Sequence, residues 1–208
     1  TAAKDIPGYS SKLNQFLQRY PTELITVGNE ENADMFYNGT TEEYHRELRA
    51  ACEVAHAKKI KCMDGGLTSS LVARLVADAA EEYMLDNPKV KKQLIVGKAL
   101  LEGFKADGSD YVNFHWYIAD TKALEEAVSF LYTSSGLPVV SNEIGQQKNE
   151  DPLQVVQIME AVERLGLDYA VWFSFDTGQR EQARGLVDED GSLRPNGEAF
   201  QSFINSHY

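Results

Sequence analysis

Leu137-Pro138-Val139-Val140-Ser141-Asn142-Glu143-Ile144-Gly145 is a short apolar run that turns polar toward its end. Its length and its β-branched residues favour a buried strand, and strands of parallel α/β sheets are apolar on both faces. The polar pair Asn142-Glu143 then lies at the carboxyl end of the strand. Ligands of such folds bind at this end, because the loops there converge on one opening. Glu143 is therefore the first candidate for a functional residue.

Four further apolar runs have the length of strands, and they cover residues 24–27, 60–63, 111–117 and 169–175. The first of them leads through Gly28 into Asn29-Glu30, so a second Asn-Glu pair follows a predicted strand. The runs at 111–117 and 169–175 contain His115-Trp116-Tyr117 and Trp172. Polar and aromatic residues thus recur at the ends of predicted strands.

Amphipathic segments with helix signals separate these runs. Thr40 and Glu43 have the spacing of a capping box, and Asp151-Pro152 is a favoured start for a helix that Gly166 ends. Further helices are expected at 12–20, after 68–70, within 87–108, after Asp120 and at 195–206. Strand alternating with helix predicts a parallel sheet with helical crossovers, in one domain of residues 1–208.

The charge of the chain excludes some partners. Asp and Glu number 32 against 20 Lys and Arg, which gives a net charge of −12. Such a surface repels phosphate backbones, so we expect no nucleic-acid partner. No run of about 18 apolar residues is present, so we expect no membrane span. Neutral sugars remain compatible with this composition.

The two cysteines, Cys52 and Cys62, fall in a predicted helix and in the strand that follows it. We expect two buried thiols rather than a disulfide. Four histidines and two cysteines do not cluster at ligand spacing, so we expect no metal site. His45 and His56 lie on a predicted helix and are expected at the surface.

Two glutamates at equivalent strand ends suit acid–base chemistry on a sugar. One carboxyl group protonates the leaving oxygen of a glycosidic bond while the other attacks the anomeric carbon. Aromatic residues beside them suit the apolar faces of a sugar ring. Glu30 and Glu143 are therefore the candidate catalytic pair, and no metal or organic cofactor is expected.

The order of these motifs resembles clan A retaining glycoside hydrolases, the 4/7 superfamily. Residues 25–30 resemble the fourth barrel strand of this clan, with Glu30 as acid/base and Asn29 as contact for a sugar 2-hydroxyl. Residues 137–145 resemble the seventh strand, with Glu143 as nucleophile. His115-Trp116-Tyr117 resembles the sixth-strand pattern, whose tyrosine contacts the nucleophile, and Trp172 falls where the eighth strand carries an aromatic platform for sugar.

This resemblance implies a (β/α)₈-barrel fold with a retaining double-displacement mechanism on a carbohydrate substrate. The barrel is expected to be incomplete, because strands 4 to 8 are present and strands 1 to 3 are missing, as in an N-terminally truncated domain. A complete barrel typically needs about 250 residues. We therefore expect self-association or a complementing N-terminal half. The resemblance also favours an extracellular or periplasmic location.

Several alternatives remain open. The chain can be a non-catalytic barrel fragment that binds sugar or needs a missing half for activity. Another barrel chemistry, such as that of a lyase or aldolase, would favour a strand-end lysine or a metal cluster, and the sequence has neither. Glu30 can also be a solvated loop acid, as its neighbours Glu31 and Asn32 allow. Core packing is the alternative role for Trp116 and Trp172.

Overall fold

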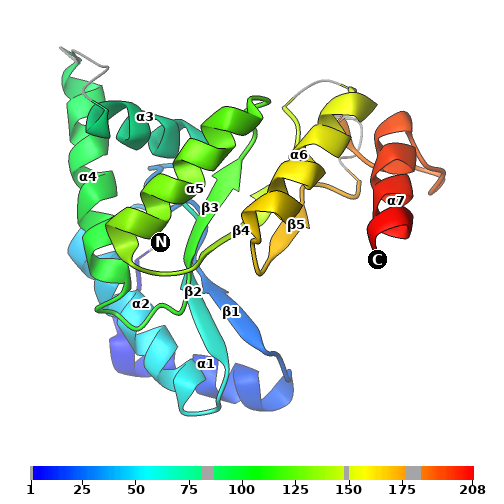
Figure 1. The fold of residues 1–208 in the computed structure, drawn as a ribbon. Coiled ribbons are helices and arrows are strands. Elements are labelled where there is room, and N and C mark those ends of the chain that lie inside the picture. Colours follow the sequence, from blue (N-terminus) through cyan, green and yellow to red (C-terminus); the bar gives the residue numbers. More distant parts are fainter. Residues whose placement is uncertain (1, 81–86, 148–149, 177–183) are drawn as a thin grey trace.

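The computed structural model describes residues 2–80, 87–147, 150–176 and 184–208. Strands and helices alternate along the chain from α1 to α7, except that α3 and α4 follow each other between β2 and β3 (Figure 1). The strands are β1 (Leu24–Val27), β2 (Lys61–Asp64), β3 (Val112–Trp116), β4 (Val139–Ile144) and β5 (Ala170–Trp172). The helices are α1 (Ile6–Arg19), α2 (Thr41–His56), α3 (Ser69–Ala79), α4 (Pro88–Phe104), α5 (Thr121–Ser135), α6 (Pro152–Leu165) and α7 (Pro195–His207).

All strand pairings among the named strands are parallel. β1 pairs with β2, and β3, β4 and β5 pair in chain order. Two parallel bridges, Met63 to Tyr111 and Leu67 to Phe114, join β2 to β3. The strands therefore follow one another from β1 to β5, as the alternation of strand and helix predicted. Among the described residues, β1 pairs only with β2 and β5 only with β4.

Hydrophobic residues on the strands divide into two clusters, because neighbouring side chains of a strand point to opposite faces. Ile25, Cys62, Val112 and Val139 belong to the large cluster between the strands and the helices. A sequence neighbour of each of these four residues belongs to a small second cluster, which consists of Leu24, Met63, Tyr111 and Val140. Figure 1 shows α2, α4 and α5 on one side of the strands, with α6 and α7 beside β5. The small cluster thus lies on the face that the helices do not cover.

Helix ends follow the predicted signals. The Thr40 side chain accepts from the N–H of Glu43, and the Glu43 carboxylate accepts from the N–H of Thr40, which completes the capping box of α2. α6 begins at Pro152 after the cap Asp151 and ends at Gly166, whose φ of 64° suits glycine. α1 begins at Ile6 rather than near residue 12.

The prediction of free thiols is wrong: Cys52 and Cys62 form a disulfide. Both side chains are fully buried, and the Cα atoms lie 5.3 Å apart. α2 packs directly on β2, so a helix residue and a strand residue that face the same core come within bonding distance. Spacing along the chain does not reveal this approach.

Histidines on α2 differ in their surroundings. His56 is largely exposed, as predicted. The side chain of His45 is only 16% exposed, because its Nδ1 contacts Asp107 and its Nε2 lies 3.1 Å from the carbonyl oxygen of Ala99. The prediction that His45 is a surface residue is therefore wrong, since the segment 99–107 at the end of α4 covers it.

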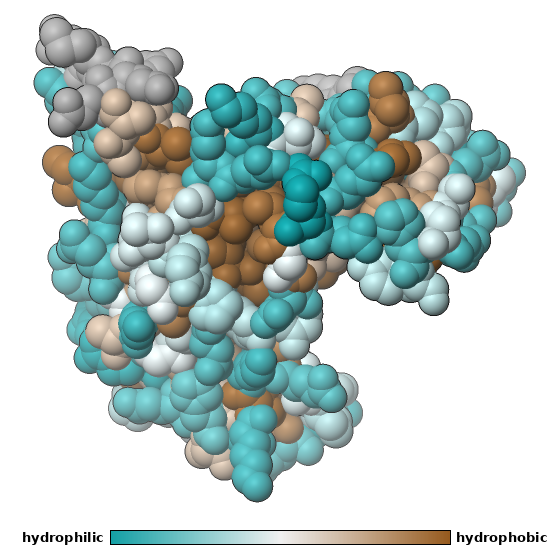
Figure 2. All heavy atoms as spheres, viewed as in Figure 1, coloured by the Kyte–Doolittle hydropathy of each residue, from teal (hydrophilic) through white to brown (hydrophobic). Residues whose placement is uncertain are grey.

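Hydrophobic residues gather in the middle of the face shown in Figure 2, beside α5. Between α5 and α6 lies a shallow groove, whose apolar lining consists of Val128, Pro138, Val139, Leu165 and Leu167. Among the described residues, no helix is both long and apolar enough to cross a membrane.

Candidate active site

Glu30 lies in the loop after β1, where the backbone makes a sharp turn. Gly28 has a φ of 89°, and Glu30 itself has a φ of 44°. A non-glycine residue in this left-handed region costs on the order of 1 kcal/mol, which the surrounding structure must offset. The turn directs the Glu30 carboxyl group to His115, with Oε1 of Glu30 2.9 Å from Nδ1 of His115. Glu30 is thus not a freely solvated loop acid.

Glu143 reaches the same place because β4 contains a bulge. Val140 lies opposite Asn113 in the register of β3 and β4, but Glu143 lies opposite His115. Three steps along β4 therefore match two steps along β3. Bulges of this kind bend a strand and change the direction of a side chain. As a result both Asn142 and Glu143 contact residues of β3 that lie on the face away from the helices.

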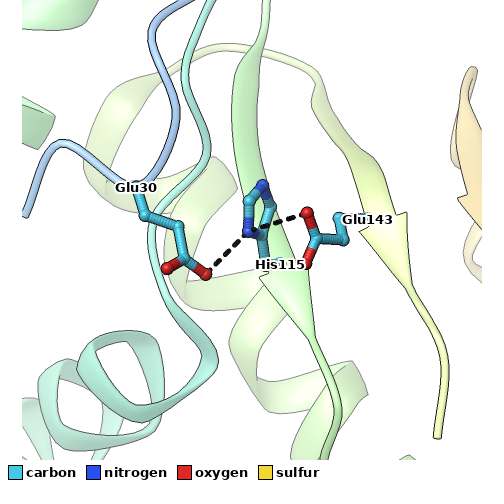
Figure 3. Close-up of side chains that lie close together, drawn as sticks. All are labelled: Glu30, His115 and Glu143. Carbon is cyan, nitrogen blue, oxygen red and sulfur yellow. Dashed lines mark hydrogen bonds and ion pairs between the residues drawn. The ribbon is translucent and has the colours of Figure 1, made fainter. Parts of the chain in front are cut away.

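His115 lies between the two glutamates (Figure 3). Its Nδ1 is 2.9 Å from Oε1 of Glu30 and 3.6 Å from Oε2 of Glu143. The imidazole is only 1% exposed, whereas the carboxyl side chains are 17% and 21% exposed. One ligand atom from each of the three residues lies within 4.8 Å of the other two. The structure therefore brings together the predicted residues Glu30, His115 and Glu143.

Tyr117 extends from the end of β3 and donates a hydrogen bond from its hydroxyl to Oε1 of Glu143. Burial raises the pKa of the Tyr117 hydroxyl, and the adjacent Glu143 carboxylate raises it further. The hydroxyl consequently keeps its proton and remains a donor at neutral pH. This contact is the one that the sequence predicted for Tyr117.

The two other predicted binding residues lie differently. The side chain of Asn29 is exposed at the rim, after Gly28. Trp172 lies opposite Ile144, a member of the large core cluster, and its ring centroid is 5.8 Å from that of Phe200 on α7. It thus lines a groove between α6 and α7 on the helix side of β5. This placement does not suit Trp172 as a platform for a sugar beside Glu143. Trp116 is also a core residue, 1% exposed.

Phe173, the residue directly after β5, is the aromatic residue that does approach the site. Its ring centroid is 6.1 Å from that of Tyr117, nearly perpendicular to it. The guanidinium of Arg184 lies over both rings, 5.4 Å from the centroid of Tyr117 and 4.9 Å from that of Phe173. Gly145 permits this approach, because a Cβ there would overlap the carbonyl oxygen of Phe173. Sequence analysis missed Phe173 and Arg184, although alternation along 169–175 offers Phe173 as the neighbour that faces the other way.

No family model and no curated protein sequence matches the chain. Solved structures do match its fold. A GH128 subgroup II endo-β-1,3-glucanase from Sorangium cellulosum superposes with a TM-score of 0.67 at 13% identity, over 93% of this chain and 75% of that one. The chain shares its fold with glycoside hydrolases.

Two other neighbours belong to the same GH128 group. One is a subgroup I endo-β-1,3-glucanase from Amycolatopsis mediterranei in complex with laminarihexaose, with a TM-score of 0.63 and 15% identity over 95% of this chain and 78% of that one. The other is a subgroup VII oligosaccharide-binding protein from Trichoderma gamsii, with a TM-score of 0.62 and 14% identity over 93% of this chain and 73% of that one. At such identities the likeness establishes the α/β fold with short parallel strands.

One buried asparagine and one buried aspartate hold the backbone beneath the site, and the sequence analysis did not identify either of them. Asn113 and Asp64 are fully buried. The Asp64 carboxylate accepts from the N–H of Asn113 at 2.8 Å and from the N–H of Gly66 at 3.0 Å. Burial raises the pKa of Asp64 to about 7, although these two hydrogen bonds act in the opposite direction. The amide of Asn113 in turn contacts Asn142 beside Glu143.

Glu31 follows Glu30 but points into the protein, where it is 6% exposed. Its carboxyl oxygens have no hydrogen-bond partner among the described residues. The nearby hydroxyl of Tyr44 donates instead to the carbonyl oxygen of Val27, at 2.7 Å. Burial raises the pKa of Glu31 well above its ordinary value, and the charge of Asp64 raises it further.

Glu30, His115 and Glu143 are the described residues that together could hold a metal ion. The 2.9 Å contact between Glu30 and His115 is, however, a normal hydrogen-bond distance, in which a proton occupies the space between the atoms. Two carboxyl groups beside a hydrogen-bonded imidazole and a tyrosine hydroxyl can transfer a proton and supply a nucleophile.

Proposed function

We propose that this chain is the catalytic part of a retaining glycoside hydrolase. Glu143 attacks the anomeric carbon and forms a glycosyl ester while Glu30 protonates the leaving oxygen. Glu30 then takes a proton from water, which attacks the ester and releases the sugar. Tyr117 holds the Glu143 carboxylate by donating to one of its oxygens. The proposed reaction uses no metal and no organic cofactor.

The observation that carries this proposal is the closeness of the two glutamates. An oxygen of Glu30 and an oxygen of Glu143 lie within 4.8 Å of each other, on either side of His115. Carboxyl groups about 5–5.5 Å apart are typical of retaining enzymes, while inverting enzymes need about 6.5–9.5 Å to admit a water. The short separation therefore supports double displacement.

A β-1,3-linked glucan is the substrate class to test first. The neighbours in the fold comparison include endo- and exo-β-1,3-glucanases of GH128, one of them bound to laminarihexaose. A lyase or aldolase of barrel type would use a lysine or metal cluster at the strand ends. None of the residues directly after the five described strands is a lysine, which argues against a lysine-dependent aldolase.

We also propose that the five strands correspond to strands 4 to 8 of a (β/α)₈ barrel. β1, β3, β4 and β5 would be strands 4, 6, 7 and 8 of a (β/α)₈ barrel, and β2 would be strand 5. The parallel order and the small apolar cluster of Leu24, Met63, Tyr111 and Val140 on the helix-free face support this view, because such a face fills the interior of a barrel. Residues 1–208 would then form one domain that lacks three barrel strands.

The test is turnover of two substrates by the purified chain. Laminarihexaose and an aryl β-glucoside with a good leaving group are incubated with the protein, and the first-formed anomer is followed by proton NMR. We expect β-configured product from both substrates. An α-configured first product would exclude retention, and the absence of cleavage at high protein concentration would exclude an autonomous enzyme.

A second candidate is an oligosaccharide-binding protein without catalysis. Two fold neighbours carry that description, from Trichoderma gamsii and Cryptococcus neoformans. Calorimetric titration with laminarihexaose distinguishes the two functions: binding with no cleavage over days supports the binding protein.

The disulfide between Cys52 and Cys62 supports an extracellular or periplasmic location. Disulfides persist in oxidising compartments and are rare where thioredoxin and glutathione keep thiols reduced. Because both sulfurs are fully buried, the bond is structural rather than redox-active in exchange with other thiols.

A further inference from the structure

We propose that Asn113 and Asn142 are positioning residues that fix the protonated nitrogen of His115 and so keep one proton in the contact between His115 and Glu30. The catalytic consequence rests on the proposed function, in which Glu30 must hold a proton when the glycosidic bond breaks. The hydrogen-bond pattern itself does not depend on that function.

The orientation of the Asn113 amide follows from backbone groups, whose polarity is fixed. The N–H of Asn142 donates to Oδ1 of Asn113 at 3.0 Å, so this atom is the carbonyl oxygen. Nδ2 of Asn113 lies 3.2 Å from the backbone oxygen of Asp64, which can only accept. A flipped amide would set its amino group against an N–H and its oxygen against a carbonyl. The amide of Asn113 therefore has one acceptable orientation.

The orientation of Asn142 follows from that of Asn113. Nδ2 of Asn113 lies 2.8 Å from Oδ1 of Asn142, and a donor there requires an oxygen opposite it. The same Oδ1 lies 3.1 Å from Nε2 of His115. Because a carbonyl oxygen can only accept, Nε2 must carry a proton. The chain of amides thus selects the Nε2–H form of His115.

The consequence appears at the other nitrogen of the ring. A neutral imidazole with a proton on Nε2 has only a lone pair on Nδ1. Nδ1 lies 2.9 Å from Oε1 of Glu30, where a bare nitrogen facing an ionised carboxylate would be repulsive. One proton must therefore lie in this contact, either on Glu30 or on a doubly protonated His115. Both arrangements hold the proton that the leaving oxygen needs.

The same arrangement suits the second half of the reaction. After Glu30 has given its proton to the leaving oxygen, its carboxylate faces the lone pair of Nδ1. This contact favours the return of a proton, which Glu30 takes from the attacking water. At the end of the cycle one proton therefore lies between Glu30 and His115 again, as at the start. No other donor or acceptor is consumed.

Close packing also fixes the position of the His115 imidazole. The imidazole is 1% exposed, and Gly66 packs against it with a φ of 92°. A Cβ at Gly66 would overlap Nε2 and Cδ2 of His115 and come within 3.0 Å of Nδ2 of Asn113. Since Asp64 accepts from the N–H groups of both Gly66 and Asn113, one buried carboxylate holds the loop and the strand together. The packing thus holds the ring with Nδ1 toward Glu30 and Nε2 toward Asn142.

The first test uses the unmodified protein and needs no activity. Long-range ¹⁵N–¹H spectra of histidine-labelled protein report which imidazole nitrogen is protonated, and His115→Gln identifies the signals of His115 among those of four histidines. We expect a proton on Nε2 at about pH 6 and at about pH 8. A neutral His115 with its proton on Nδ1 only would overturn the proposal.

The second test uses the nearly isosteric substitution Asn113→Asp to reverse the direction of the hydrogen bonds that run from residue 113 through Asn142 to His115. The introduced carboxylate still accepts from the N–H of Asn142 but no longer donates to Oδ1 of Asn142 or to the backbone oxygen of Asp64. Asn142 then turns its amino group toward His115, and the proton of the neutral ring moves to Nδ1. We expect cleavage of laminarihexaose to slow about 10²-fold or more, with a change of less than about 3-fold for an aryl glycoside with a good leaving group.

Ser141→Ala is the matched control, since it removes a buried hydrogen bond from Ser141 to Phe114 on the same two strands without touching the amide chain. It should leave the Nε2 proton in place and affect both substrates alike. If Asn113→Asp fails to fold, Asn142→Leu removes the acceptor of Nε2, and the spectra should show the proton on Nδ1.

Persistence of the Nε2 proton in a folded Asn142→Leu protein would overturn the proposal, as would equal slowing of both substrates by Asn113→Asp. The NMR readout separates this proposal from the proposed function. If the spectra agree with the prediction but the protein cleaves no glycoside, the positioning role of Asn113 and Asn142 stands and the proposed hydrolase function is wrong.

Discussion

Glu143 lies opposite His115 in the register of β3 and β4, although Val140 lies opposite Asn113. The extra residue in β4 lets Asn142 and Glu143 contact the same imidazole, one at Nε2 and the other at Nδ1. In a regular strand, consecutive side chains point to opposite faces, so only one of them would reach this site. The bulge therefore lets one short segment supply both the proposed nucleophile and the proposed positioning amide.

Glu143→Ala and Glu30→Ala should differ in their dependence on the leaving group. Glu143→Ala should nearly abolish turnover of every substrate, because the attacking atom is lost. Glu30→Ala should slow laminarihexaose by about 10²-fold or more but spare an aryl glycoside with a good leaving group, whose departure needs little acid help. Added azide should accelerate Glu30→Ala on the aryl substrate. The measurement is kcat for each variant with each of the two substrates.

Glu102→Ala, on the exposed face of α4, serves as the control and should match the unmodified protein. Small and equal losses in the Glu30 and Glu143 variants would contradict the assigned roles.

Tyr117→Phe tests the hydroxyl that holds Glu143. The ring contacts with Phe173 and Arg184 remain, while the donor to Oε1 is lost. We expect kcat to fall about 10²- to 10³-fold, as for the loss of one fixed donor in an active site. Because burial raises the pKa of Tyr117, the hydroxyl stays protonated, and the loss should be constant across neutral pH. Tyr132→Phe at an exposed site on α5 should have no effect, and a similar loss there would rule out a specific role.

Much of the fold could be predicted from the sequence, because local signals carry it. The Thr40 capping box, the Asp151-Pro152 start and the five apolar runs depend only on neighbouring residues, and the strands and helices follow them. The disulfide could not be predicted. It depends on the packing of α2 on β2, which brings Cys52 and Cys62 together across a loop.

The candidate site could be predicted in part. Glu30, His115, Tyr117 and Glu143 do come together. Trp172 was expected beside them, but the β4 bulge displaces the register with β5, and Trp172 pairs with Ile144 and faces the helices. A shift of one residue moves a side chain to the other face of a strand, so Phe173 lies beside Tyr117 instead. Bulges leave no clear mark in a single sequence.

Glu31→Gln should change the pH dependence of stability. The folded state raises the pKa of Glu31 above its unfolded value, so it binds more protons than the unfolded chain between the two values. The unmodified protein therefore loses stability as pH rises above about 4, and Asp64 adds to the loss with the same sign. The variant lacks the Glu31 contribution. Its free energy of unfolding relative to the unmodified protein should therefore rise between about pH 5 and about pH 8.

Urea denaturation at the two pH values measures this change. The absolute stability of Glu31→Gln is not diagnostic, because the introduced amide is also buried without a partner, so only the difference between pH values is compared. Parallel pH profiles for the two proteins would show that the folded state does not raise the pKa of Glu31.

Removal of the disulfide should lower stability. Replacing both Cys52 and Cys62 by alanine frees a loop with a sequence separation of 10 in the unfolded chain. The chain-entropy estimate for such a loop is about 3 kcal/mol, and the lost sulfur contacts in the core add to it. Urea denaturation with and without dithiothreitol measures the effect. Dithiothreitol should destabilise the unmodified protein and leave the double variant unchanged, and equal stability of all samples would argue against the bond.

The open side of the sheet should make the isolated chain associate. Among the described residues, β5 pairs only with β4, and its neighbourhood exposes Tyr169, Val171 and Phe175 at 37%, 54% and 67%. An unpaired apolar strand edge is a template for pairing with another chain. Five strands are also too few to close into a barrel of ordinary tilt, since small barrels have about eight. Copies of this chain, or a partner that supplies further strands, would cover the edge.

Light scattering with a charged edge variant tests this expectation. Val171→Lys places a charge on the edge strand and should shift the chain toward the monomer mass of 23.2 kDa. Ile95→Lys, at a position 69% exposed on α4, introduces the same charge at an equally apolar surface site away from the sheet and should leave the association unchanged. A monodisperse monomer of the unmodified chain with cooperative unfolding would contradict the prediction. It would mean that the edge is covered within the chain itself, and that five parallel strands suffice to hold Glu30 and Glu143 in place.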